Sequence, residues 1–117
     1  MTLQECYAAM SGDYEGTLAR FRREASVQKF LGKFLYDPSY NNIKTSMAAN
    51  NQEEAFRGAH TLKGVSQNLG LTQLYESSHE LTEALRGGDM QKAETLLPQV
   101  DADYQMCADA IRELCGE

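Results

Sequence analysis

A histidine, a lysine, a glycine and a glutamine recur at helical spacing in the middle of the chain. His60, Lys63, Gly64 and Gln67 occupy positions i, i+3, i+4 and i+7 of the segment AHTLKGVSQNLG, so a helix places them on one stripe. A free imidazole has a pKa of about 6.5, so near neutral pH one ring nitrogen often keeps a lone pair that can attack phosphorus. A lysine can balance the charge of phosphoryl oxygens. The stripe therefore predicts a surface that receives a phosphoryl anion.

Gly64 is the unusual member of this stripe. Glycine in a helix interior costs about 1 kcal/mol relative to alanine, so its position one turn after His60 calls for a reason. The missing side chain opens a notch beside the imidazole. We predict that another molecule approaches the helix closely at this notch.

The stripe belongs to a helix that we expect over residues 52–69. Its inward positions are apolar or small and recur every three or four residues: Ala55, Ala59, Leu62, Ser66 and Leu69. Because His60 lies off that face, its ring is predicted to point toward solvent. Gly70 suits the left-handed conformation that often follows a helix end. The tight turn after it predicts an antiparallel hairpin with a second helix that ends at Gly87-Gly88.

Helical spacing also dominates the rest of the chain. Thr2 and Glu5 form a capping-box pattern for a short helix to about Met10, and Asp13 begins another short turn. A helix over residues 23–36 and one after Asp37-Pro38 come next, and a last helix from Asp89 to Leu114 is expected to bend at Pro98. The predicted core faces of these three helices are Val27, Phe30, Leu31, Phe34 and Leu35, then Tyr40, Ile43 and Met47, then Leu97, Val100, Tyr104, Cys107, Ile111 and Leu114. The prediction is an all-α protein: an antiparallel four-helix bundle with one or two short leading helices, in a single domain over residues 1–117.

Composition limits the function further. The chain has 17 acidic and 11 basic side chains and a net charge of -6, which disfavours binding to nucleic acid. It has no apolar run of the roughly 20 residues that a membrane span requires, and no signal peptide. Its three cysteines match no zinc or redox motif. We expect a cytoplasmic, monomeric protein that binds neither membrane nor nucleic acid.

The segment from 59 to 70 resembles the signature of histidine-containing phosphotransfer (HPt) domains, His-x-x-Lys-Gly-x-x-x-x-Leu-Gly. The resemblance implies that His60 is phosphorylated at Nε2 and that Lys63 and Gly64 assist it. It also implies that the partners are response-regulator receiver domains and a hybrid histidine kinase. His60 would accept the group from a receiver aspartyl phosphate and pass it to another receiver. The protein would then be a phosphocarrier and not an enzyme, with no cofactor of its own, because the receiver supplies the magnesium ion.

Several neighbours are predicted to support or dock at this site. The hairpin places Thr82 opposite His60, where many HPt domains have Glu or Gln, so its hydroxyl is a candidate to orient the ring. Arg57 and Arg86 either add positive potential or pair with surface acids such as Glu53 and Glu83. Phe56 either belongs to an apolar docking rim or is a half-buried core residue. Gln67 is the candidate amide donor one turn beyond Gly64.

Other readings of the same residues stay open. The chain is alternatively the phosphoacceptor domain of a chemotaxis-type histidine kinase, or a non-catalytic adaptor bundle that only docks partners. A metal site is not expected, because His60 and His79 lack a third ligand at suitable spacing, and His79 itself is interpreted as an ordinary solvated histidine. An enzyme is least favoured, since there are no paired carboxylates, nucleophile with its base, or phosphate-cradling loop.

Overall fold

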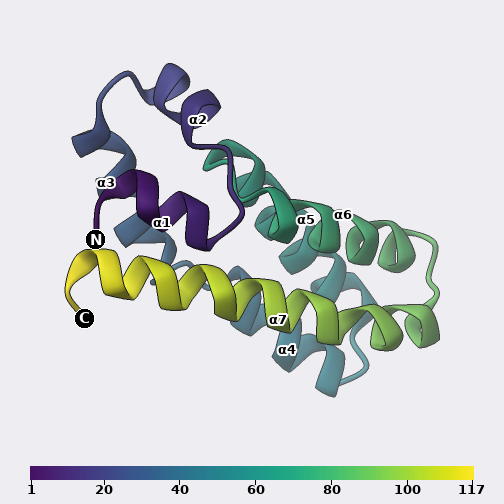
Figure 1. Ribbon diagram of the computed structural model, residues 1–117. Helices are drawn as coiled ribbons and strands as arrows, with labels where there is room; N and C mark the ends of the chain where they lie inside the picture. The colour runs from purple at the N-terminus through teal and green to yellow at the C-terminus, as the bar shows by residue number, and fades with distance from the viewer.

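The computed structural model describes all residues from 1 to 117 and contains only helices (Figure 1). Seven helices follow one another: α1 (Leu3–Ala9), α2 (Tyr14–Phe21), α3 (Glu24–Phe34), α4 (Ser39–Ala48), α5 (Gln52–Asn68), α6 (Thr72–Arg86) and α7 (Met90–Cys115). The all-α prediction is confirmed, and the predicted helix boundaries agree with these to within about two residues.

Local sequence explains where most of these helices begin. Thr2 and Glu5 form the predicted capping box of α1, and the side chains of Asp13, Asn51 and Asp89 each accept a backbone N–H in the first turn of α2, α5 and α7. Gly70, with φ of 69°, turns the chain between α5 and α6 in the left-handed region. These caps fix the start of α5 and the hairpin that follows it.

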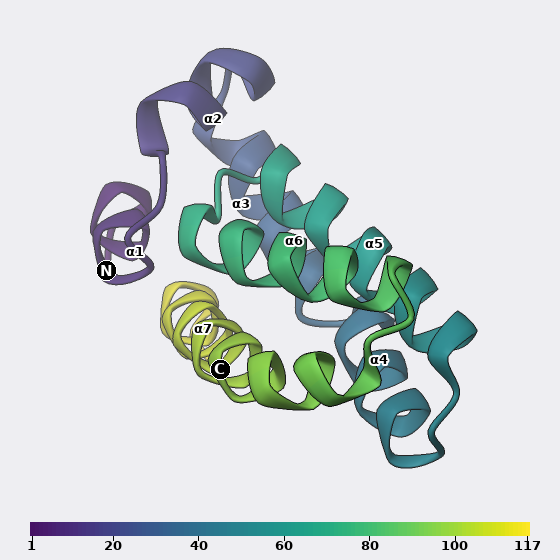
Figure 2. The same cartoon turned by 90° about the vertical axis from the view of Figure 1, so that its right-hand side faces the viewer.

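The main bundle is formed by α4 to α7, in which each helix packs against the next one in the chain. Figures 1 and 2 show α5 and α6 side by side, and α7 runs along α6. The rings of Tyr40 and Tyr104 stack with centroids 3.9 Å apart and so connect α4 to α7, and Lys44 pairs with Asp101 across the same helices at 2.8 Å. Apolar residues from six helices, among them Leu31, Ile43, Leu62, Leu81 and Ile111, form one continuous core.

The N-terminal segment packs at the end of the bundle where α5 and α7 terminate. Helix α1 lies on α7. Side chains and backbone of the segment from Tyr7 to Arg20 form hydrogen bonds with the end of α5 and the turn after it. The last four backbone carbonyls of a helix find no N–H donor within the helix. Here the carbonyls of the last two residues of α5, Gln67 and Asn68, accept hydrogen bonds from Arg20. The carbonyls of Leu69 and Gly70, in the turn that follows, accept from the Tyr7 hydroxyl and the Asp13 N–H. The segment therefore caps the end of the helix that carries His60.

One residue, Phe30, differs from the pattern that the sequence suggests, whereas α7 behaves as expected. Phe30, predicted to lie in the core, is 40% exposed, because α3 is covered on only one side and the ring rests against Phe21 of α2 instead. Helix α7 continues without interruption through Pro98, and Figure 2 shows that it changes direction along its length, as expected of a helix that contains proline.

None of the seven helices combines the length and the apolar character needed to cross a lipid bilayer.

Candidate phosphoacceptor site

Helix α5 presents His60 to solvent. Ala55, Ala59, Leu62 and Ser66 are buried against the neighbouring helices, and His60 lies on the opposite side and is exposed. Neither ring nitrogen forms a hydrogen bond within the protein. The prediction that this imidazole is accessible is therefore confirmed.

Free space lies beside the ring at Gly64. A Cβ atom built on Gly64 would meet no other atom within 4 Å, so nothing in the protein fills the notch one turn after His60. Gly58 on the same helix is different, because its Cβ would lie 2.9 Å from Ile43 Cγ1 and 3.1 Å from the Ser39 carbonyl oxygen. The glycine at 58 is thus required by packing against α4, whereas the glycine at 64 leaves the surface open.

Cationic and aromatic groups surround the imidazole. The rings of Phe56 and His60 stack with centroids 5.8 Å apart, and the Arg86 guanidinium of α6 lies 5.0 Å from the centre of the Phe56 ring. Arg86 Nε also donates to Glu83 at 3.0 Å, and this bond lowers the pKa of the Glu83 carboxyl, with smaller contributions from His79 and Lys63. Lys63 is half-buried and has no ion-pair partner, so its charge stays available on the stripe that carries His60.

The sequence model of the Hpt domain matches residues 18–116, nearly the whole chain. The chain belongs to the Hpt domain family. Members of this family are phosphotransfer proteins of two-component signalling, which act as phosphocarriers and interact with receiver domains. Searches of curated proteins and of solved structures gave no significant match.

The remaining predicted residues of this Hpt domain divide into those near the stripe and those engaged elsewhere. Gln67 is exposed, and its side chain makes no hydrogen bond within the protein. Arg57 pairs with Glu53 at 3.3 Å and with Glu54 at 3.2 Å, which realises the second of its two predicted roles. Phe56 is half-buried against the core, which is the second of its two expected roles, and its ring stacks on that of His60.

Thr82 does not orient the His60 ring. Its side chain is fully buried, and its hydroxyl donates to the Ser78 carbonyl oxygen at 2.6 Å within α6. Thr82 does lie on the helix that faces α5, but the short side chain turns into the bundle and bonds to its own backbone. The predicted contact is therefore wrong, and in the free protein the nitrogens of His60 face solvent.

The second histidine lies in a different environment. His79 is half-buried on α6, its ring stacks on Tyr75 with centroids 6.0 Å apart, and its Nδ1 is buried without a hydrogen-bond partner. An Nε2 nucleophile needs its proton on Nδ1, and at His79 that proton would be buried without an acceptor. The ring is thus poorly suited to accept a phosphoryl group. No group of three or more His, Cys, Asp or Glu side chains is arranged to hold a metal ion.

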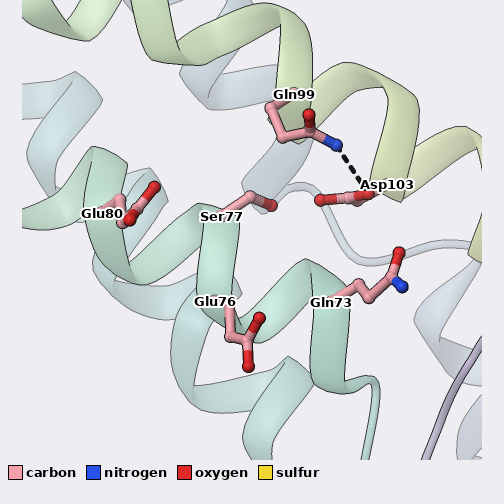
Figure 3. Close-up of a pocket in the computed structure, with 6 residues that line it drawn as sticks. All are labelled: Gln73, Glu76, Ser77, Glu80, Gln99 and Asp103. Carbon is pink, nitrogen blue, oxygen red and sulfur yellow. Dashed lines mark hydrogen bonds between the residues drawn. The ribbon is translucent and has the colours of Figure 1, made fainter.

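A hollow between α6 and α7 has the opposite electrostatic character. It has a volume of about 250 Å³ and is lined by Gln73, Glu76, Ser77, Glu80, Gln99 and Asp103 (Figure 3). Three of these six residues are carboxylic acids, and the Asp103 carboxylate accepts a hydrogen bond from Gln99 at 3.0 Å. A phosphoryl anion would be repelled there, so the hollow does not compete with His60 for the same chemistry.

The structure adds one residue that the sequence did not point to. Arg20 of α2 lies beside Gly64, Gln67 and Asn68 at the surface of α5. It is 47 residues away from Gln67 in sequence, so no helical spacing relates the two. The only signal in the sequence was the basic cluster of Arg20, Arg22 and Arg23 at the C-terminal end of α2.

Proposed function

We propose that this Hpt domain accepts a phosphoryl group on His60 from the aspartyl phosphate of one receiver domain and passes it to the aspartate of another. The observation that carries the proposal is the exposed His60 ring beside an open notch at Gly64. A receiver must bring its phosphoaspartate to within bonding distance of a ring nitrogen. A bulky side chain at position 64 would obstruct that approach.

The proposed step exchanges one bond for another. The lone pair of His60 Nε2 attacks the phosphorus of the aspartyl phosphate, a P–N bond forms, and the bond between phosphorus and the carboxylate oxygen breaks. The aspartate leaves as a carboxylate with the electron pair of that bond. The ring keeps its Nδ1 proton until water accepts it, and transfer to the second receiver reverses these events.

The neighbouring residues have distinct roles in this proposal. Lys63 is unpaired and one turn from His60, so its ammonium group stabilises the negative charge on the phosphoryl oxygens. Phe56 limits the orientations of the imidazole by stacking on it, and Arg86 is held over Phe56 by its bond to Glu83. Gln67 offers an amide donor to the receiver surface beyond the notch.

The Hpt domain is expected to supply no metal or cofactor. The charge that develops during transfer is balanced by Lys63 on one side and by the magnesium ion of the receiver on the other. We place this reaction in the cytoplasm, where the thiols of Cys6, Cys107 and Cys115 remain reduced, in agreement with their unpaired state in the structure.

The test is transfer from phosphorylated receivers. Receiver domains from the organism that makes this chain are labelled at their aspartate, mixed with the Hpt domain, and the Hpt domain is then assayed for acid-labile, alkali-stable phosphate. We expect label on the wild-type protein and none on His60→Gln, whereas His79→Gln serves as the matched control and retains it. Equal labelling of wild type and His60→Gln refutes the assignment of His60.

The same assay separates the alternatives. Label that arrives only from a kinase catalytic domain with ATP, and never from a receiver, identifies the phosphoacceptor domain of a chemotaxis-type kinase. Receiver binding without any phosphate on His60 identifies a non-catalytic adaptor.

A further inference from the structure

Helices α2 and α3, directly before the main bundle, carry most of the unneutralised positive charge of the protein. Residues 14–34, which span α2 and α3, contain five basic side chains and two acidic ones, a net charge of +3, so the rest of the chain carries -9 of the total of -6. The five are Arg20, Arg22, Arg23, Lys29 and Lys33. All five are exposed, and the ion pairs of the protein involve other residues, Lys44, Arg57, Arg86 and Arg112.

Arg20 is held in place by one nitrogen of its guanidinium group. Its NH2 atom donates to the carbonyl oxygens of Asn68 at 2.8 Å and Gln67 at 3.2 Å, and lies 3.4 Å from the Thr17 hydroxyl. The guanidinium has five N–H donors, so those on NH1 and Nε remain without a partner in the protein. A fixed cation with free donors is preorganised for an incoming anion.

Two of these cations line hollows at the surface of the phosphoacceptor helix, α5. Arg20 lines a shallow hollow of about 330 Å³ with Gly64, Gln67 and Asn68, and Lys33 lines another of about 210 Å³ with Phe30, Val65 and Asn68 among others. Asn68 belongs to both. Arg20 and Lys33 therefore flank the C-terminal half of α5, and the hollow of Arg20 includes the Gly64 notch.

The acidic residues close to these cations are mostly engaged by the protein itself. Asp13 accepts the Gly16 N–H at 3.0 Å, Asp37 accepts the Ser39 N–H at 2.9 Å, and Glu24 accepts the Tyr14 hydroxyl. None of these carboxylates pairs with Arg20 or Lys33. Glu15 is the remaining acid of α2, and it too lacks an ion-pair partner.

We propose that Arg20 and Lys33 form an electrostatic docking surface for an acidic patch on the receiver domain; this inference rests on the proposed function of His60. The donor's aspartyl phosphate is an anion, and most of this acidic protein repels it. The surface of α2 and α3 is where approach is favourable, and it adjoins the notch where transfer takes place. Charges at the rim of an interface act mainly on the association rate and weaken with salt.

The test measures transfer against receiver concentration, with the receiver that labels wild-type His60 fastest. In the double variant Arg20→Glu and Lys33→Glu, the half-saturating receiver concentration rises about tenfold at low salt, while the rate at saturation stays within twofold. At about 1 M salt, where the Debye length is roughly 3 Å, the difference from wild type falls to within twofold. Arg20→Lys, which keeps the charge, retains most of the wild-type affinity.

Two controls separate docking from helix capping and from net charge. Tyr7→Phe removes another cap of the same α5 end without changing charge, and Lys92→Glu reverses one positive charge on α7, which is half of the charge change of the double variant. Neither is expected to move half-saturation by more than twofold. An unchanged value in the double variant, or an equal rise in Tyr7→Phe, overturns the docking surface while leaving His60 as the phosphoacceptor.

Two further results overturn the inference in other ways. If no receiver labels wild-type His60, the proposed function itself fails, and the docking surface fails with it. If wild-type protein binds phosphatidylglycerol vesicles through Arg20 and Lys33 while transfer is insensitive to both, the basic surface serves a membrane instead.

Discussion

Substitution of Gly64 separates the stability of α5 from its accessibility to a receiver. Because a Cβ at this position meets nothing within 4 Å, Gly64→Ala should gain the helix propensity of alanine, about 1 kcal/mol, without a steric cost. For a domain of this size that gain raises the Tm by about 4 °C. Gly64→Gln should keep roughly half of it, since glutamine is also a good helix former.

The same substitutions should slow phosphotransfer. The glutamine side chain fills the notch beside His60 and holds the receiver away, so we expect transfer to His60 to fall by at least about tenfold; a displacement of about 1 Å can cost a hundredfold. Alanine adds a single carbon and should have a smaller effect. Thermal melts followed by circular dichroism give the stability, and single-turnover labelling gives the transfer rate.

Gly58→Ala is the matched control because it makes the same change on the same helix. Its Cβ would press against Ile43 and the Ser39 carbonyl, and overpacking costs about 1–3 kcal/mol, which outweighs the propensity gain. We therefore expect a lower Tm for Gly58→Ala and a higher one for Gly64→Ala. A lower Tm for Gly64→Gln, or transfer at the wild-type rate, refutes the view that Gly64 serves access and not packing.

Three further outcomes are expected. Burial raises the pKa of Tyr7 from 10.0 to about 12, so the folded protein holds this proton more tightly, and stability present below pH 10 should be lost as the pH rises toward 12; denaturant titrations should show a shallower loss in Tyr7→Phe. Burial also raises the pKa of Cys6 to about 11 and of Cys107 to about 12, so a thiol reagent at pH 8 should label only the exposed Cys115 in native protein and all three cysteines after unfolding. Thr82→Val should lower stability by about 1 kcal/mol or less and leave transfer to His60 within twofold of wild type, whereas a large loss of transfer would restore a role for this hydroxyl in orienting the ring.

The periodicity of the sequence was sufficient to predict the fold class and the exposure of His60. Both depend on which face of α5 is apolar, and that is determined by residues three and four positions apart. The position of Phe30 was predicted wrongly because a stripe tells which residues share a face, but not how far a neighbouring helix covers it. The predicted contact between Thr82 and His60 was wrong for a related reason. Counting residues from the turn of a hairpin shows which backbone positions face each other, but not where a short side chain points. Arg20 was missed because its partners are carbonyls of a distant helix, and such contacts leave no local spacing.

The hydrogen bonds from the N-terminal segment to the end of α5 determine how short a fragment of this protein can be while α5 stays intact. The family match begins at residue 18, yet Tyr7 and Asp13, which secure the carbonyls of Leu69 and Gly70, lie before it. A fragment trimmed to the matched boundary would lose both and would also leave α2 truncated, so the last turn of α5 should fray and Arg20 should lose its anchorage. The first seventeen residues thus stabilise the end of α5 and are part of the structural unit that this protein needs, although they fall outside the region shared with the family.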